Sequence, residues 1–261
     1  MDKSLLEKNI TLDRRASILE NLGKNGIVQV NILSKSYKVS EVTIRNDLIH
    51  LEKKGLLIRT RGGAIKQQSV SHDFPLNEKA IYNLNEKQRI AKKAVEFINE
   101  GDTIILDSGT TTLEIAKNLA SFNNLTVITN AINIAGQLAQ YKNLRVIMVG
   151  GTLRSKSLSL VGTTAEDSLK NFYCDKVFMG VDGIDTAYGI STPNIEEAHL
   201  NRVMINVSRE LIVVTDYSKF LKRSLALICP ISKINKIITD KKIPKEELYK
   251  LNNSNIETII V

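Results

Sequence analysis

Two short stretches of the chain carry residue types that could do chemistry. The first is residues 40–48, Ser-Glu-Val-Thr-Ile-Arg-Asn-Asp-Leu, where hydroxyl, guanidinium and amide groups stand close together. Such groups can contact the phosphates and base edges of duplex DNA. The second is residues 107–111, Asp-Ser-Gly-Thr-Thr, where hydroxyls surround a glycine. Hydroxyls and free backbone N–H groups at the start of a helix favour a bound phosphate.

The first stretch has the pattern of a helix with a polar N-terminal end. Ser40 is a good N-cap, because its hydroxyl can accept a free backbone N–H of the first turn. Apolar residues recur at spacings of four and three and are expected to face the core; they are Ile44, Leu48 and Leu51. The polar residues at the exposed start of the helix, which we expect to contact DNA, are Ser40, Thr43, Arg45 and Asn46.

Two further helices are predicted before this one. The first covers Asp13–Gly23, with Asp13 as its N-cap, and the second covers Asn31–Tyr37, anchored by Ile32 and Leu33. Two short helices, a tight turn and a third helix with polar residues at its start are typical of a helix-turn-helix.

A β-wing is predicted after the third helix. Gly55 suits the position that ends the helix, where a left-handed residue is needed. Residues 56–64, Leu-Leu-Ile-Arg-Thr-Arg-Gly-Gly-Ala, are interpreted as a strand, a basic tip and a glycine turn. Arg59 and Arg61 would share one face of the strand and lie along phosphates or reach into a minor groove.

The charge of the chain is concentrated at its N-terminal end. The formal net charge is +8, and residues 1–66 hold 13 Lys and Arg against 7 Asp and Glu. This distribution favours one polyanion-binding module attached to a nearly neutral body. The hydrophobic content of 43% excludes disorder over most of the length, and no apolar run approaches the ~20 residues of a membrane span. With no secretory signal expected, a cytoplasmic protein is predicted, and Cys174 and Cys229 are expected to be buried reduced thiols.

The rest of the chain is predicted to be an α/β domain. Residues 67–80 are expected to form a linker between a DNA-binding domain at 10–66 and the domain at 81–261. Helical periodicity covers Asn83–Asn99, after which short β-branched runs alternate with amphipathic segments, as in a mostly parallel sheet covered by helices. The expected strands are Thr103–Asp107, Leu125–Thr129, Leu144–Gly150, Lys176–Gly180, Leu211–Thr215 and Lys236–Thr239. The expected helices are Thr112–Ala120, Ala131–Ala139, Thr163–Asn171, Glu196–Val207 and Pro244–Leu251.

Ligands of such sheets bind beyond the carboxyl ends of the strands, so the residues there are the candidate site. Cations and N–H groups suit a phosphate, whereas carboxylates and amides suit sugar hydroxyls. The candidates for a phosphorylated sugar or polyol are Asp107, Ser108, Gly109, Thr110, Thr111, Asn130, Gly150, Gly151, Asp182, Glu197 and Lys219. Structural explanations stay open for each of them: a cap and turn, strand-to-loop geometry, or a surface charge.

The N-terminal motifs resemble the DeoR family of bacterial transcriptional regulators. The resemblance lies in residues 40–48, 51–59 and 61–64, and it implies a winged helix-turn-helix with its motif at about Val28–Asp47. Asn46 and Arg61 depart from the family pattern, which has arginine and histidine there. Because Asn pairs with adenine and Arg prefers guanine, we expect a different operator sequence and the same binding mode.

The C-terminal motifs resemble the sensor domain of the same family, which is similar to the folds of ribose-5-phosphate isomerase and coenzyme A transferases. The matching segments are Leu106–Thr111, Leu125–Asn130, Val149–Gly151, Gly180–Asp185, Glu197 and Ser218–Phe220. The resemblance covers about residues 10–240 and implies that a phosphorylated sugar is sensed there and not converted. Residues 189–197 resemble members that control amino-sugar, galactitol or tagatose pathways.

Two functions follow as hypotheses. The first is a repressor of a sugar-catabolism operon that binds double-stranded operator DNA as a homo-oligomer, dimer or tetramer, under control of a phosphorylated sugar. The alternative is a sugar-phosphate isomerase with a nucleic-acid-binding module, in which Asp107, Asp182, Glu197 and Lys219 would supply acid, base and electrophile. Neither hypothesis requires a cofactor or a metal.

Overall fold

The computed structural model describes residues 3–53, 56–66, 73–254 and 256–261. The chain divides into two compact units, Met1–Ser69 and Val70–Val261. None of the helices that the structure describes is both long enough and apolar enough to span a bilayer.

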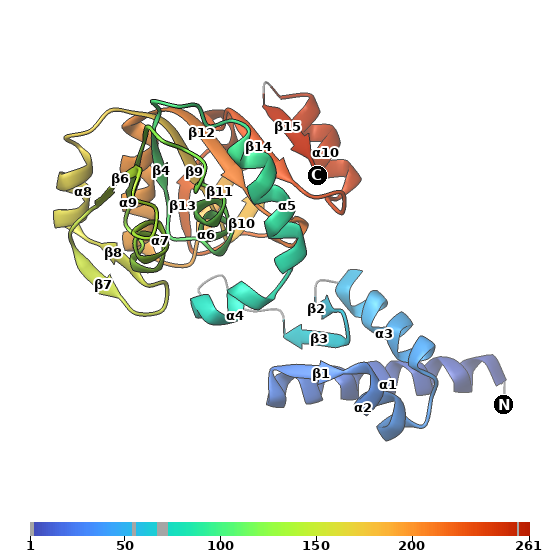
Figure 1. Cartoon of the computed structure of the whole chain (residues 1–261). Coiled ribbons are helices and arrows are strands. Elements are labelled where there is room, and N and C mark those ends of the chain that lie inside the picture. The colour runs from blue at the N-terminus through green and yellow to red at the C-terminus, as the bar shows by residue number, and fades with distance from the viewer. Residues whose placement is uncertain (1–2, 54–55, 67–72, 255) are drawn as a thin grey trace. The chain divides into compact units, whose positions relative to one another are not determined.

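The first unit is a winged helix-turn-helix, as expected (Figure 1). Its wing is the antiparallel hairpin of β2 and β3, and β1 adds to β3 so that the sheet order is β1-β3-β2. The predicted apolar face of the third helix is buried, with Ile44, Leu48 and Leu51 packed against Ile18 and Leu22 of the first helix. The elements are α1 (Lys3–Asn25), β1 (Ile27–Gln29), α2 (Val30–Tyr37), α3 (Glu41–Lys53), β2 (Leu57–Thr60) and β3 (Gly63–Lys66).

Three local predictions in this unit are corrected. Helix α1 begins at Lys3, so Asp13 lies inside the helix and is not its N-cap; the residues before it include Leu, Glu and Lys and no Gly or Pro, which lets the helix start earlier. Leu33 anchors α2 at 3% exposure, whereas Ile32 is 58% exposed, because neighbouring helix residues point about 100° apart. Arg61 lies in the turn after β2 and not on the strand face. Gly55 lies outside the described residues.

A buried carboxylate holds the third helix to the first. Asp47 of α3 is 1% exposed and accepts hydrogen bonds from Arg14 Nε at 2.5 Å and Arg15 Nε at 2.7 Å. A buried charge needs such partners, since an unpaired one would cost several kcal/mol. Asp47 therefore fixes the orientation of α3 from inside the unit, while the other side of the helix stays exposed.

The second unit is built on a seven-stranded parallel sheet, as the alternating pattern predicts. Its order is β15-β14-β12-β9-β4-β5-β6. The strands are β4 (Thr103–Leu106), β5 (Leu125–Thr129), β6 (Leu144–Met148), β9 (Cys174–Met179), β12 (Ser208–Val214), β14 (Lys236–Thr239) and β15 (Glu257–Ile260). The chain runs outward from β4 to β6 and then returns to the other side of β4, so the strand order reverses between β4 and β9. Ligands of open parallel sheets bind at such a reversal.

Helices cover both faces of this sheet and divide the core into two clusters. One cluster joins the sheet to α5, α6 and α7, and the other joins it to α8, α9 and α10 (Figure 1). These helices are α5 (Leu84–Val95), α6 (Thr110–Lys117), α7 (Ile132–Leu138), α8 (Thr163–Leu169), α9 (Ile195–Asn206) and α10 (Lys245–Asn252). Cys174 and Cys229 are buried free thiols, and burial raises the pKa of each to about 11.

Several elements of this unit have no counterpart in the predicted pattern. Helix α4 (Leu76–Ile81) begins within the segment 67–80 that was expected to be a linker, and residues 73–80 belong to the second unit. Residues 67–72 lie outside the described residues. The sequence gives no sign of α4 because none of its residues is buried. The other additions are β15 at one edge of the parallel sheet, the hairpin of β7 (Thr152–Arg154) and β8 (Ser159–Val161), and a small antiparallel sheet of β10 (Gly183–Asp185), β11 (Gly189–Thr192) and β13 (Ala226–Cys229).

Two neighbouring glycines at the wing allow a matched test of this fold. A Cβ on Gly63 would lie 1.8 Å from the Val28 carbonyl oxygen of β1, whereas a Cβ on Gly62 meets nothing within 4 Å. Gly63→Ala should therefore destabilise the first unit by about 2–4 kcal/mol, and Gly62→Ala by less than about 1 kcal/mol. Thermal unfolding, with amide exchange of β1 and β3 to locate the loss, measures both. Equal effects of the two substitutions would show that β1 does not approach the wing this closely.

Candidate functional site

The N-terminal end of α3 has the predicted cap. The backbone N–H of Thr43 donates to Ser40 Oγ at 3.1 Å, and the hydroxyls of Ser40 and Thr43 lie 2.9 Å apart. Arg45 and Asn46 are exposed on the same end of the helix. The four residues expected at a DNA interface are therefore brought together by one helix start.

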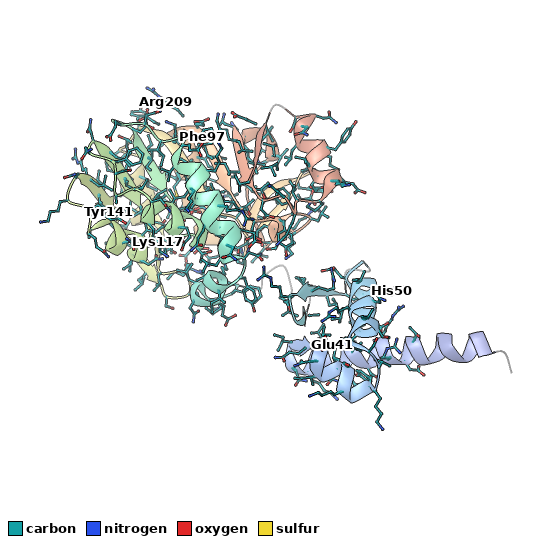
Figure 2. All side chains as sticks on the ribbon, turned by 45° about the vertical axis from the view of Figure 1, so that its right-hand side comes forward. Glu41, His50, Phe97, Lys117, Tyr141 and Arg209 are labelled. Atoms are coloured by element: carbon teal, nitrogen blue, oxygen red, sulfur yellow. The ribbon has the colours of Figure 1, made fainter. Side chains whose placement is uncertain are left out.

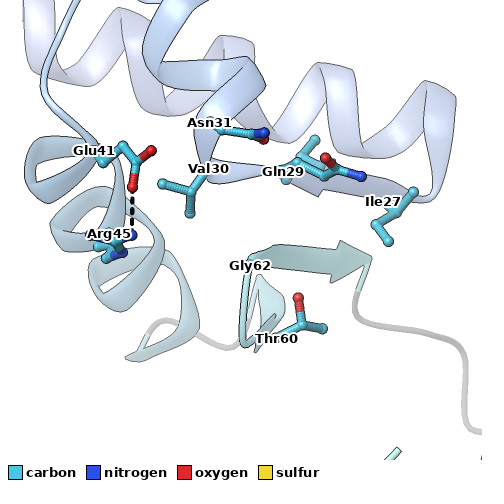
Figure 3. Close-up of a pocket in the computed structure, with 9 residues that line it drawn as sticks. Ile27, Gln29, Val30, Asn31, Glu41, Arg45, Thr60 and Gly62 are labelled. Carbon is cyan, nitrogen blue, oxygen red and sulfur yellow. Dashed lines mark hydrogen bonds and ion pairs between the residues drawn. The ribbon is translucent and has the colours of Figure 1, made fainter. Parts of the chain in front are cut away.

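An open hollow lies beside this helix start, inside the first unit (Figure 3). Its volume is about 330 Å³, and β1, the start of α2, the start of α3 and the wing turn line it. Arg45 reaches Glu41 at 2.5 Å across one turn of α3, and both side chains are about half exposed. Such an exposed pair contributes about 0.3–0.5 kcal/mol, so the guanidinium can exchange Glu41 for another anion at little cost.

The wing carries the other two expected residues, and they differ in their surroundings. Arg59 is tied to α3, because its backbone N–H and its Nε both donate to Glu52, at 3.0 and 2.7 Å. Arg61 is exposed at the turn. Val42, 62% exposed at the start of α3, was not singled out from the sequence, although an apolar side chain there suits a thymine methyl group.

In the second unit, the loop between β4 and α6 has a defined shape. The buried Thr112 hydroxyl lies 2.9 Å from the carbonyl oxygens of both Asp107 and Gly109, which share its one hydrogen, and it accepts the N–H of Gly109. A Cβ on Gly109 would lie 2.8 Å from that hydroxyl. The loop therefore requires glycine, and it holds Ser108, Thr110 and Thr111 at the start of α6.

Asp107 is the buried carboxyl group of this loop. It is 4% exposed, its Oδ2 accepts the backbone N–H of Gly180 at 2.9 Å, and its Oδ1 has no hydrogen-bond partner among the described residues. Burial raises the pKa of Asp107 to about 7, and the charges of Glu197 and Asp182 add to the effect. Gly180 follows β9, so Asp107 sits where the strand order reverses.

Asp182 joins two lysines to this edge of the sheet. Its carboxylate lies 2.8 Å from Lys79 Nζ and 3.6 Å from Lys219 Nζ. Burial alone would raise the pKa of Asp182, but the charges of Lys79 and Lys219 outweigh it and lower the pKa below its ordinary value. Burial would lower the pKa of Lys79, and its acidic neighbours, Asp182 first, raise it instead.

Arg154 of β7 pairs with two more carboxylates, those of Asp73 and Glu197. Its guanidinium is in close contact with Asp73, and it lies 3.1 Å from Glu197 and 2.8 Å from Ser157 Oγ. Glu197 also accepts hydrogen bonds from the hydroxyls of Ser159 at 3.2 Å and Thr192 at 3.3 Å. We call Asp73, Lys79, Arg154, Asp182, Glu197 and Lys219 the charge cluster.

The remaining expected residues have structural partners. Asn130 Nδ2 donates to the Leu160 carbonyl at 3.2 Å, while its buried Oδ1 has no partner in the described part of the chain. Gly151 has φ +133°, and a Cβ there would lie 2.7 Å from the Val161 carbonyl oxygen. The glycine therefore permits close contact between β8 and the residue that directly precedes β7, and Gly150 beside it is exposed.

Four residues of this region were not found from the sequence: Asp73, Lys79, Lys87 and Arg154. The first two lie in the segment expected to be a linker, and Arg154 lies on a strand too short to show alternation. Lys87 is buried in α5 and donates to the Tyr82 carbonyl oxygen at 2.6 Å, and burial lowers its pKa to about 8. The arrangement offers cations and hydroxyls to a phosphate and carboxylates to hydroxyls. No group of three or more metal-ligating side chains gathers in the part of the chain that is described.

The raised pKa of Asp107 gives a pH-dependent stability. An unfolded aspartic acid loses its proton near pH 3.9, whereas folded Asp107 keeps it to about pH 7. Between these values the unfolded state binds fewer protons, so this residue lowers stability as the pH rises. Asp107→Asn can still accept the Gly180 N–H and does not titrate. The stability of the variant relative to wild type should rise by on the order of 1–2 kcal/mol from pH 5 to pH 8 in urea unfolding. A constant difference would contradict a protonated Asp107.

Comparison with known proteins finds relatives that align with this chain over most of their length and of its length. The chain is 44% identical over 259 residues to the "Putative aga operon transcriptional repressor" of Escherichia coli O157:H7, covering 98% of this chain and 96% of the relative. It is 39% identical to the "Transcriptional repressor AccR" of Agrobacterium fabrum, covering 89% of this chain and 90% of the relative. Among solved structures, ribose 5-phosphate isomerase A of Methanocaldococcus jannaschii aligns with a TM-score of 0.41 at 18% identity, over 54% of this chain and 56% of that one.

Two family models match the two units. The model of the DeoR-like helix-turn-helix domain matches residues 14–70, and the model of the DeoR C-terminal sensor domain matches residues 82–241. The match to the sensor model alone spans more than half of the chain, and the two models follow each other in the order of the two units. The chain belongs to the DeoR family of transcriptional regulators.

Proposed function

We propose that this protein is a repressor of a sugar-catabolism operon whose operator binding is controlled by a phosphorylated sugar. The observation that supports binding of a phosphorylated sugar is the charge cluster, which lies beside the Asp107 loop, where the strand order reverses. The names of the two relatives, a "Putative aga operon transcriptional repressor" and the "Transcriptional repressor AccR", support a repressor.

On the DNA side, α3 serves as the recognition helix. Its exposed start presents Thr43, Arg45 and Asn46 to base edges in the major groove, with Ser40 near a phosphate. Arg61 at the wing tip contacts the backbone or the minor groove, and Arg59 does so only if it gives up Glu52. Two copies of the chain would read a paired operator, so a homo-oligomer, dimer or tetramer, is part of the proposal.

On the effector side, the ligand is a phosphate ester of an amino sugar, galactitol or tagatose. The phosphate is bound by cations of the charge cluster and by Ser108, Thr110 and Thr111 at the start of α6. The hydroxyls of the sugar bind Asp107, Glu197 and Asn130, two of which carry unpartnered buried oxygens among the described residues. Gly150 and Gly151 border this space.

A sugar-phosphate isomerase is the second candidate, because Asp107 with its pKa near 7 could move a proton. The named relatives are repressors, which favours the regulator. Incubation of the purified chain with pentose and hexose phosphates separates the two functions. Saturable binding without turnover agrees with the regulator, and turnover would establish the enzyme.

Substitution of Arg45 tests whether the start of α3 contacts operator bases. Arg45→Ala should weaken operator binding about 5- to 150-fold, because a side chain that contacts a base contributes ~1–3 kcal/mol. Arg209→Ala is the matched control, since it removes an exposed arginine from the second unit (Figure 2). Fluorescence anisotropy with a duplex selected from a random library measures both. If the two variants bind within twofold of wild type, Arg45 is no contact.

The effector is tested by thermal shift with phosphate esters of galactosamine, N-acetylgalactosamine, tagatose and galactitol. A ligand at 100 times its dissociation constant adds ~2.7 kcal/mol, which for a unit of this size raises the melting temperature by roughly 5–10 °C. The unphosphorylated sugars are the controls and should leave it unchanged. Equal shifts with and without the phosphate group would contradict a phosphate subsite.

A further inference from the structure

We propose that Asp73 occupies the position of the effector's phosphate group. An anionic ligand that binds Arg154 displaces the Asp73 carboxylate and so releases the segment that carries it. The inference rests on the proposed sugar-phosphate effector. It assigns Arg154 as the ligand of the phosphate and Asp73 as a built-in competitor.

The segment around Asp73 is attached to the second unit mainly by polar contacts. Asp73 contacts the Arg154 guanidinium closely and lies 3.7 Å from Lys79 Nζ. The backbone N–H of Leu76 donates to the Lys156 carbonyl oxygen, in the turn of the β7–β8 hairpin, at 2.8 Å. Helix α4, which follows, has no buried residue. Helix α4 has attachments of its own, since Lys79 pairs with Asp182 at 2.8 Å and Lys87 Nζ donates to the Lys79 and Tyr82 carbonyl oxygens. An anion that competes for Arg154 therefore acts on the attachment at Asp73, before α4.

The balance of charge favours the displacement of one carboxylate. The charge cluster contains three cations, Lys79, Arg154 and Lys219, and three carboxylates, Asp73, Asp182 and Glu197. A phosphate dianion added to this neutral set would leave excess negative charge in a partly buried site, which is unfavourable. The departure of one carboxylate removes part of that excess.

Asp73 is the carboxylate that can leave. Glu197 is held by Arg154, by two hydroxyls and by the hydrogen bond of its own backbone N–H to Asn194 in the first turn of α9. Asp182 closely follows β9, an inner strand of the parallel sheet, and keeps two lysines. Asp73 instead belongs to a short segment without buried helix residues, three positions after the unit boundary at Val70.

Arg154 suits a phosphate in its chemistry. A guanidinium presents a planar fork of donors that matches phosphate oxygens, and one arm of this fork is already fixed by Ser157 and Glu197. The other arm holds Asp73. The phosphate oxygen thus replaces a carboxylate oxygen at the same nitrogen, and the ligand binds one arrangement of the segment better than the other, as any regulatory ligand must.

Asp73→Asn tests the competition, and Glu78→Gln is its matched control. Both substitutions remove one negative charge between residues 73 and 81, but Glu78 is exposed and lies outside the charge cluster. Calorimetric titration of the full chain with inorganic phosphate should show at least tenfold tighter binding for Asp73→Asn and a change of less than twofold for Glu78→Gln. Unchanged or weaker binding by Asp73→Asn would overturn the proposal.

Amide exchange of the wild-type chain tests the release without any variant. Saturating inorganic phosphate, or a phosphate ester that binds, should increase exchange of the Leu76 N–H, which is bonded to the Lys156 carbonyl oxygen, while it slows exchange at the start of α6. Slower or unchanged exchange of the Leu76 N–H overturns the release and leaves the effector site intact. Failure of every phosphate and phosphate ester to bind wild type or either variant would instead refute the proposed function, and the inference with it.

Discussion

The burial of opposite charges beside one edge of the parallel sheet is the interaction on which the second unit depends. Six ionised side chains meet there, and each is stable in its partly buried position only because a counter-charge is adjacent. They come from the segment before α5, from β7, from the end of β9, from α9 and from the turn after β12. The arrangement therefore forms only when these distant segments have folded together, and an added anion must alter it.

In the first unit, buried ion pairs fix the position of the recognition helix. Asp47, buried between two arginines of α1, sets the position of α3 from within, and the exposed start of the helix is left with residues whose partners are easily exchanged. The weak Arg45–Glu41 pair contrasts with the buried Asp47 pairs. Strong pairs thus fix the scaffold, and weak pairs keep the recognition residues available.

Periodicity in the sequence predicts the elements whose position is determined by burial of apolar side chains. It does not predict the buried ion pairs. The six expected strands of the parallel sheet are found with their ends within three residues, and Asp182 and Lys219 beyond these ends do meet. Three members of the charge cluster were not predicted, because their positions depend on ion pairs between distant segments and not on an apolar pattern around them. They are Asp73, Lys79 and Arg154. For the same reason Asp47 could not be recognised as buried, since its partners lie more than thirty residues away in the chain.

Reciprocal linkage tests the central claim, that one ligand-dependent rearrangement couples the two units. The affinity of the full chain for a stabilising sugar phosphate is measured by calorimetry, with and without a saturating operator duplex. If the sites are coupled, the duplex must change this affinity by the same factor, roughly fivefold or more, by which the sugar phosphate changes operator affinity. Equal sugar-phosphate affinities with and without the operator would contradict the coupling.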